Sequence, residues 1–321
     1  MGYLVKEIGP EDTAILRRKY ESRKFHSGKA DISGICVKLY TEEHQVMDMW
    51  VDNFYAMSTS VKSHARIISV KEEDRGMEVL YDRSTFTVFL INFDYYGWIK
   101  SIALAVAADL LEDSHSIHSV HGAAIDLDGV GVTLIAPSKT GKTTQSWGLL
   151  RTGDSRLITD DWYFVRLTSG RPFVTGSEKN CYIDADIGDV WPEFKPLVST
   201  TKFDNKGRGI ANIRWVTGID SVTATTSMRH VILLKRDRED ERIVRKLDLD
   251  EALEYIVSND FCNPHQMVRD ERKLRIRTDF FREFFGKCTV FLVNTTGSPE
   301  QTQMSIRKAI NEAECGRVCE V

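Results

Sequence analysis

Hydrophobic residues in the first 95 positions come in short runs that alternate with charged turns. Residues 65–71 and 85–92 are two such runs, and their β-branched and aromatic side chains predict strands. The charged segment 72–76 lies between them, and no residue pattern that carries chemistry is found in this part of the chain. We therefore interpret residues 1–95 as an accessory domain of mixed α+β structure.

The stretch 98–111 has a different period, typical of a helix. Its apolar residues repeat at helical spacing: Ile99, Ile102, Val106 and Leu110. We expect a helix that packs on the core, with a membrane or partner contact as the alternative for such an apolar stripe. The stretch contains Lys100 and Asp109 and is too short to span a bilayer.

Strand-like segments dominate the rest of the chain. Residues 120–127 and 130–136 predict two strands around the turn Asp128-Gly129, and a helix is expected from Lys142 to about residue 152, ended by Gly153. Later expected elements are strands at 156–159, 174–176, 211–216, 231–234 and 289–293, and a terminal helix at 299–313. Because few helices separate these strands, we predict that residues 96–321 form an α/β core with a mixed sheet rather than a doubly wound one.

The segment 136–144 reads Ala-Pro-Ser-Lys-Thr-Gly-Lys-Thr-Thr and lies between an expected strand and an expected helix. That is the context of a phosphate-binding loop, in which successive backbone N–H groups form an anion nest and the helix N-terminus adds its positive dipole end. A turn that merely caps a helix is the alternative. The residues predicted to hold the nucleotide are Ser138, Lys139, Thr140, Gly141, Lys142, Thr143 and Thr144.

Individual residues of this loop have distinct expected roles. Gly141 allows the backbone to pass close to the phosphates, the Lys142 ammonium reaches the β- and γ-phosphates, and the Thr143 hydroxyl ligates Mg²⁺. Ala136 occupies the position of the first glycine in the strict motif, and Lys139 occupies the position of the usual second one. If Ala136 needed a positive φ, the strain would be about 1–2 kcal/mol.

Two adjacent carboxylates, Asp160 and Asp161, follow the apolar strand 156–159. Ligands of open α/β sheets bind at the carboxyl ends of strands, so this pair is expected near the phosphates. One carboxylate would hold Mg²⁺, for which we choose Asp161, and one would accept the proton of an attacking hydroxyl. Which of the two is the base stays open, and a solvated Asp-Asp turn is the alternative.

The composition narrows the class of partner. The 321 residues include 43 Lys and Arg and 47 Asp and Glu, which gives a net charge of −4 and no argument for nucleic acid or an anionic membrane. The first residues lack the pattern of a secretory signal, and the six cysteines show no CxxC pair, so we expect free thiols and a cytoplasmic protein. The pair Cys315 and Cys319 is the remaining candidate for metal binding, but no second pair of ligands accompanies it in the sequence.

Together these segments resemble the superfamily of HPr kinase/phosphorylase and ATP-dependent phosphoenolpyruvate carboxykinase. Residues 119–135 and 156–161 look like the strand pair and the aspartate segment of the kinases, and 138–144 is closer to the carboxykinase loop. Weaker similarities are found at 208–214, 291–295 and 305–307. The resemblance implies a P-loop kinase core of this type, covering roughly residues 115–315.

The resemblance also implies roles for matching residues. His121 corresponds to an active-site histidine that ligates metal in the carboxykinases and lies near the reacting groups in the kinases. Arg214, and less clearly Arg208, would neutralise charge on the transferred phosphoryl group. For His121 a structural role is the alternative, and for Arg214 a surface position at a strand edge. The segment 177–180 is interpreted as a solvated loop, with a place on the acceptor side as the other option.

These observations favour an ATP- and Mg²⁺-dependent kinase that phosphorylates a hydroxyl group. The acceptor would be a small metabolite or a protein Ser or Thr, and no nucleic acid or membrane partner is expected. The oligomeric state stays open, a homo-oligomer included. Two alternatives remain: a nucleotide-binding regulatory protein without turnover, and a phosphoryl-transfer enzyme that uses ADP or pyrophosphate.

Overall fold

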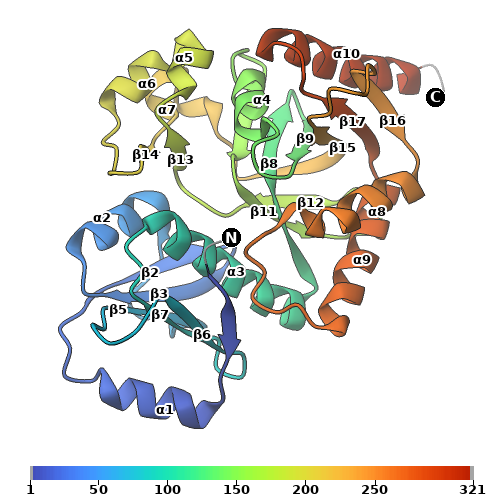
Figure 1. Ribbon diagram of the computed structural model, residues 1–321. Helices are drawn as coiled ribbons and strands as arrows, with labels where there is room; N and C mark the ends of the chain where they lie inside the picture. The colour runs from blue at the N-terminus through green and yellow to red at the C-terminus, as the bar shows by residue number, and fades with distance from the viewer. Residues whose placement is uncertain (1–2, 319–321) are drawn as a thin grey trace. The chain divides into compact units, whose positions relative to one another are not determined.

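Two mixed β-sheets, each in its own compact unit, organise the chain in the computed structural model, which describes residues 3–318 (Figure 1). The first unit contains the chain up to Ser116 and two later segments, Ser177–Tyr182 and Pro264–Arg269. The second unit contains the remaining residues from Ile117 onward. The first boundary therefore falls after Ser116, whereas the catalytic core was expected to begin at residue 96.

The first unit is built on a seven-stranded sheet with the order β1-β6-β7-β5-β3-β2-β4. Parallel pairs (β1 with β6, β7 with β5, β5 with β3) combine with antiparallel pairs at β6–β7, β3–β2 and β2–β4. The strands are β1 (Val5–Glu7), β2 (His26–Ile32), β3 (Ile35–Thr41), β4 (Tyr55–Ala56), β5 (Ala65–Val70), β6 (Glu78–Asp82) and β7 (Thr87–Ile91).

Three helices, α1 (Pro10–Lys19), α2 (His44–Asn53) and α3 (Tyr96–His115), belong to the same unit. Neighbouring residues of β6 show that helices cover both faces of the sheet. Leu80 joins the apolar cluster under α1, while Tyr81, which points the other way, donates a hydrogen bond of 2.7 Å to Asp109 of α3. The predicted helix at 98–111 is thus confirmed within α3, and its apolar positions are buried.

The second unit contains an eight-stranded sheet in which β8, β11, β12, β15 and β9 form a closed circuit of hydrogen-bonded neighbours. Both β8 and β15 are long enough to pair with different strands along their two halves. The strands are β8 (Ile117–Leu127), β9 (Val130–Ile135), β10 (Ser155–Thr159), β11 (Trp162–Arg166), β12 (Phe173–Gly176), β15 (Thr225–Lys235), β16 (Val244–Leu247) and β17 (Thr289–Asn294). A small two-stranded sheet pairs β13 (Cys181–Asp184) with β14 (Arg208–Ala211).

The second unit also contains helices of different lengths. Residues of α8 and α9 join β-strand residues in one apolar cluster, so these two helices seal part of the sheet from water. The helices are α4 (Lys142–Leu149), α5 (Ile187–Val190), α6 (Lys195–Thr200), α7 (Arg214–Thr217), α8 (Leu249–Ser258), α9 (Glu271–Gly286) and α10 (Pro299–Val318), with 3-10 turns η1 (Pro192–Phe194), η2 (Ile219–Ser221) and η3 (Asp260–Cys262).

Two expected elements are wrong in detail. The segment 211–216, expected as a strand, contains the end of β14 followed by the short helix α7, because a short apolar run does not distinguish strand from helix. Helix α4 begins at Lys142 as expected but ends at Leu149. Gly153 lies beyond it and is not among the glycines with positive φ, so it does not end the helix in the way proposed.

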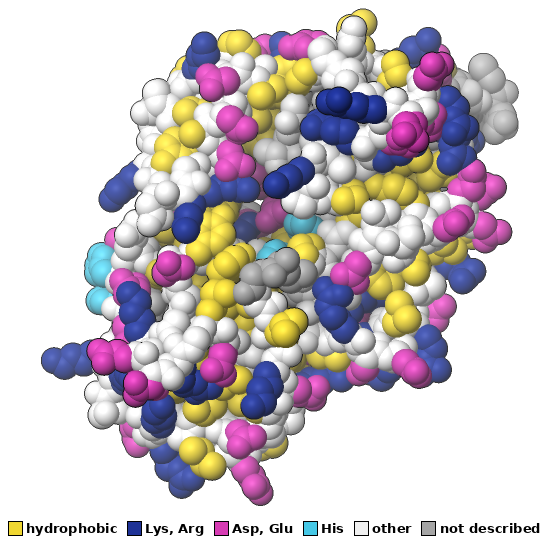
Figure 2. All heavy atoms as spheres, in the orientation of Figure 1, with side chains coloured by type: hydrophobic (Ala, Val, Ile, Leu, Met, Phe, Trp, Pro, Cys, Tyr) yellow, Lys and Arg dark blue, Asp and Glu magenta, His cyan; other side chains and the backbone are white. Residues whose placement is uncertain are grey.

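The described residues therefore form a mixed α/β structure with two mixed sheets and a small two-stranded sheet. Between residues 3 and 318, every helix is too short or too polar for a bilayer crossing. On the face shown in Figure 2, acidic and basic side chains are interspersed. The division into an N-terminal accessory domain and a P-loop catalytic core stays a prediction.

Candidate functional site

The loop between β9 and α4 contains two residues in the left-handed region, Lys139 with φ 66° and Gly141 with φ 96°. Glycine accepts this conformation without strain, whereas a lysine does not, so the loop is held in its shape by its surroundings. Ala136 is buried and is not among the residues with positive φ, so the strain considered for that position does not arise. The absence of a first glycine is therefore compatible with this loop.

The start of α4 offers free backbone donors. Its N-cap is Gly141, and no side chain caps the helix. Since the first N–H groups of a helix have no partner within it, those of Lys142, Thr143 and Thr144 are available to an anion. Thr140 stiffens the loop by donating a hydrogen bond of 2.7 Å from its hydroxyl to the Pro137 carbonyl.

Lys142, Asp161 and His121 meet in one cluster of the second unit. Lys142 Nζ donates to Asp161 Oδ1 at 2.8 Å and lies 3.5 Å from the Asp160 carbonyl oxygen. His121 Nε2 lies 3.1 Å from the same Asp161 oxygen. The three side chains are only partly exposed, at 13%, 27% and 17% for Lys142, Asp161 and His121, so the ion pair of Lys142 with Asp161 is less screened than at an open surface.

Strand register explains why distant residues meet there. In the antiparallel pair β8–β11, His121 lies opposite Trp162, and the Gly122 N–H donates to the Asp161 carbonyl at 2.8 Å. The pairing of β10 with β8 is irregular between Leu157 and Thr159, just before Asp160, as is common where strands present functional side chains. A Cβ atom at Gly122 would lie 2.8 Å from the Leu134 carbonyl oxygen, so this close packing requires glycine.

A turn with left-handed backbone conformation contacts the second ring nitrogen of His121. His121 Nδ1 lies 2.7 Å from the Cys262 carbonyl oxygen. Asp260, Phe261 and Cys262 all have positive φ, at 52°, 56° and 52°. Such non-glycine residues each cost on the order of 1–3 kcal/mol and are concentrated at functional sites. Since a carbonyl and a carboxylate both accept hydrogen bonds, both ring nitrogens of His121 face acceptors and the ring is fixed in orientation.

The Cys262 thiol is not a candidate nucleophile. Burial raises the pKa of Cys262 to about 12, although the nearby Lys142 ammonium acts in the opposite direction. The thiol is therefore protonated at neutral pH, and only the thiolate attacks substrates or binds metal. Cys262 contributes its backbone carbonyl to the site. Cys36 and Cys315 are also free thiols, and Cys319 lies outside the described residues.

The oxygen ligands near the loop fit a magnesium nucleotide. Asp160 is buried, with 7% of its surface exposed, and Asp161 and Thr143 are partly exposed. Carboxylates and hydroxyls are the hard oxygen ligands that Mg²⁺ prefers, and free amides with a lysine suit phosphates. Thr143 and Asp161 are thus chemically suited to the metal, and Ser138, Lys139, Thr140, Lys142 and Thr144 lie on the loop and the first turn of α4.

Arg236 is a residue near the loop that the sequence analysis missed. Its Nε donates to the Thr295 hydroxyl at 3.3 Å, and that hydroxyl donates to the Thr140 carbonyl at 2.7 Å. A Cβ atom at Gly141 would lie 3.7 Å from Arg236 Nη2. Arg236 itself carried no signal in the sequence, although its partner Thr295 lies in the resemblance at 291–295. Arg307 instead donates to the Leu149 carbonyl at 2.8 Å, at the end of α4.

The remaining predicted residues lie in other surroundings. Arg214 is in α7, not at a strand edge, and its backbone N–H and Nη1 each donate to Asn212 Oδ1 at 3.2 Å. Arg208 Nε pairs with Asp184 Oδ1 at 2.6 Å. A role of either arginine at the phosphoryl group stays a prediction. The expectation of a solvated loop at 177–180 is wrong for Glu178, because only 2% of its side chain is exposed and the carboxylate pairs with Lys100 at 2.9 Å in the first unit.

A mixed α/β unit that places a lysine, a carboxylate and a histidine together at a helix N-terminus defines a candidate phosphate-binding site. The chain is 28% identical over 128 residues to the HPr kinase/phosphorylase of Lachnoclostridium phytofermentans, which covers 39% of this chain and 35% of that protein. It is 28% identical over 139 residues to the HPr kinase/phosphorylase of Chlorobium limicola, which covers 43% of this chain and 37% of that protein.

These matches support a distant relationship to the HPr kinase/phosphorylase family. They span little more than a third of the length of each relative. No protein-family model matches the chain. The relationship therefore concerns only part of each relative, and both the activity and the acceptor of this chain have to be argued separately.

Proposed function

We propose that this chain is an ATP- and Mg²⁺-dependent kinase that transfers the γ-phosphoryl group to a hydroxyl. The observation that supports this most strongly is the cluster of Lys142, Asp161 and His121 at the first residues of α4. An uncapped helix N-terminus, a lysine and adjacent carboxylates are the parts that phosphoryl transfer needs, because this chemistry depends on positioning and on neutralising charge.

The proposed roles follow from the chemistry of each side chain. The backbone N–H groups of residues 138–144 and the Lys142 ammonium bind the phosphates, and Thr143 and Asp161 hold the metal. When bound, magnesium neutralises charge on the phosphoryl oxygens. Asp160 or Asp161 accepts the proton of the attacking hydroxyl. His121 fixes the Asp161 carboxylate in position, and Arg214 neutralises charge on the transferred group.

The acceptor in this proposal is a hydroxyl of one of two classes. The names of both relatives state that they act on the protein HPr, so a protein serine or threonine is one acceptor class for this chain. A small metabolite with a hydroxyl is the other. A cytoplasmic location and a possible homo-oligomeric state belong to the same proposal.

The test is a phosphoryl-transfer screen with labelled ATP against a metabolite library and a cell extract, with Lys142→Ala as the blank. We expect a labelled product with the native chain and at least a hundredfold lower rate with Asp161→Asn, because metal binding and charge balance are lost together. Unchanged turnover in Asp161→Asn would contradict the metal role. Tight ATP binding without any labelled product would favour a regulatory protein without turnover.

The word phosphorylase in the name of both relatives favours one further alternative, a phosphoryl-transfer reaction with ADP or pyrophosphate. Parallel assays with ATP, ADP and pyrophosphate as phosphoryl donor or acceptor would distinguish it from the kinase. Activity with pyrophosphate or inorganic phosphate alone, and none with ATP, would replace the kinase proposal.

A further inference from the structure

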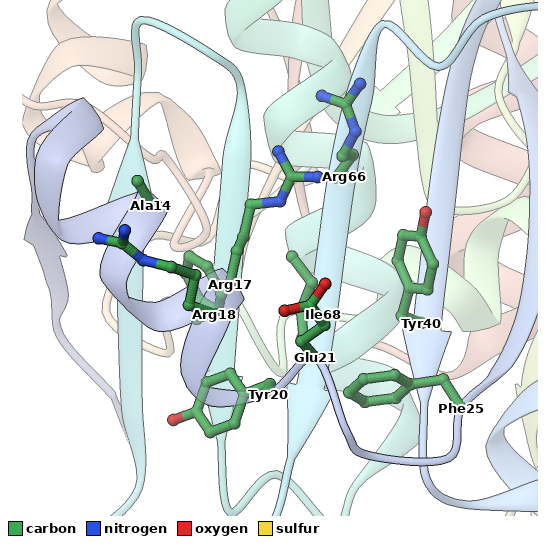
Figure 3. A pocket seen from close by; sticks show the side chains of 10 residues that line it. Ala14, Arg17, Arg18, Tyr20, Glu21, Phe25, Tyr40, Arg66 and Ile68 are labelled. Carbon is green, nitrogen blue, oxygen red and sulfur yellow. The ribbon is translucent and has the colours of Figure 1, made fainter.

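A cavity of about 470 Å³ lies in the first unit, between α1 and the sheet (Figure 3). Its base is apolar, because Ile68 and Phe89 are buried, and half-buried rings of Phe25 and Tyr40 form one wall. The arginines Arg17, Arg18 and Arg66 also line the cavity. The side chain of Arg17 reaches from α1 over the sheet towards Arg66, as Figure 3 shows.

The strand register of β3 and β5 places one pair of basic residues next to a pair made of an aromatic and an apolar residue. Lys38 of β3 lies directly next to Arg66 of β5, and Tyr40 lies next to Ile68 two residues further on. Like charges in opposite positions of neighbouring strands destabilise a sheet. Lys38 also lies over the Tyr40 ring, with Nζ 4.4 Å from its centroid. The sheet therefore places the cation Lys38 beside Arg66 and Tyr40, two residues that line the cavity.

Nearby cations of the same unit are neutralised by carboxylates. Lys19 pairs with Glu72 at 2.6 Å, and Arg23 pairs with Glu42 at 3.0 Å. Within residues 3–318, by contrast, neither Arg17 nor Arg66 forms an ion pair, although Glu21 lines the same cavity. Guanidinium groups that converge without a carboxylate partner are suited to an external oxyanion, which they bind through charge-assisted hydrogen bonds.

We propose that this cavity binds a small ligand that joins an oxyanion, phosphate or carboxylate, to an aromatic ring. Arg17 and Arg66 bind the oxyanion, and the ring packs between Phe25 and Tyr40 over Ile68. Glu21 at the rim lowers the affinity for a dianion by repulsion. The site lies within the first unit and does not depend on the proposed kinase activity.

The experiment is calorimetric titration of the full-length chain with phenyl phosphate, benzoate and inorganic phosphate. Phenyl phosphate or benzoate binds saturably, and inorganic phosphate binds at least tenfold more weakly because it lacks the ring. Arg66→Met and Arg17→Met each lower the affinity by about tenfold or more, as expected for a lost hydrogen bond between charged groups. Glu21→Gln raises the affinity for phenyl phosphate.

Two controls isolate the cavity. Lys62→Met removes an exposed cation elsewhere in the first unit and leaves binding unchanged. Lys142→Ala removes the ammonium of the candidate nucleotide site and also leaves it unchanged. The proposal is overturned if neither aromatic anion binds at millimolar concentration, if Arg66→Met binds as the native chain does, or if the binding is lost in Lys142→Ala. A thermal melt of each variant excludes unfolding as the cause of a loss.

Discussion

At the scale of single residues, the site depends on side chains from four separate parts of the sequence. Lys142 begins α4, Asp161 precedes β11, His121 lies in β8, and Arg236 follows β15. The first three carried signals in the sequence, because each belongs to a pattern with a known chemical use. Arg236 carried none, since it is one exposed arginine in a charged segment. Its position beside Gly141 is visible only in the folded chain.

We predict that Arg236→Met raises the KM for ATP by about tenfold to a hundredfold, because a hydrogen bond from a charged group to phosphate contributes about 1.5–3 kcal/mol. Steady-state kinetics with varied ATP would measure this. Arg238→Met is the matched control, since Arg238 is exposed two residues further on, and its KM should stay unchanged. Equal KM values for both variants and the native chain would remove Arg236 from the proposed nucleotide site.

At the scale of elements, hairpin geometry decides where His121 lies relative to the loop between β9 and α4. Strands β8 and β9 are joined by the turn Asp128-Gly129, whose residues have φ of 50° and 85°. Positive φ at both positions is the signature of a type I′ turn, which fits the twist of a two-residue hairpin. The turn thereby fixes the register of β8 against β9, and with it the relation of His121 to the loop after β9.

We predict that Gly129→Ala lowers the free energy of unfolding by about 1–2 kcal/mol, because alanine is strained at positive φ. No heavy atom lies within 4 Å of the added Cβ atom, so the effect comes from the backbone alone. Urea unfolding followed by circular dichroism would measure it. Gly153→Ala, which has the same open space but no positive φ, should be neutral or slightly stabilising. Equal effects of the two substitutions would contradict this account.

At the scale of the whole molecule, the first unit is assembled from three separate stretches of chain. Glu178, from the second of them, enters its interior and pairs with Lys100 of α3, and Asn53 Nδ2 donates to the same carboxylate oxygen at 3.0 Å. Both side chains of the ion pair are 2% exposed. A buried pair of this kind costs desolvation energy but becomes much more harmful when one partner is removed.

We predict that Lys100→Met destabilises the chain by about 3–5 kcal/mol, because Glu178 is left as an uncompensated buried charge. The double variant Lys100→Met with Glu178→Leu should recover most of that loss, and chemical unfolding of the three proteins would show it. Lys19→Met, which breaks an exposed ion pair with Glu72, should have a far smaller effect. A double variant as unstable as Lys100→Met would show that packing, rather than charge, is responsible.

The sequence alone determined the local elements and the chemistry of the loop. The helix at 98–111, the hairpin at 120–136 and the start of α4 at Lys142 were predicted because periodicity, turn residues and the strand–loop–helix order are local properties. Residue type alone also indicates that Lys142 is suited to bind phosphate, and that Thr143 and the two aspartates are suited to bind a metal ion. Their catalytic roles stay predictions.

Only the tertiary structure decided which distant residues surround that loop. Three features of the folded chain depend on contacts between residues far apart in sequence: the left-handed turn at Asp260–Cys262, the position of Arg236 beside Gly141, and the burial of the Glu178 side chain. The contact of His121 with Cys262 joins residues 141 positions apart, and the contact of Lys100 with Glu178 joins residues 78 positions apart. Such contacts form when apolar surfaces are buried and polar groups must then find partners. A one-dimensional pattern does not contain that pairing.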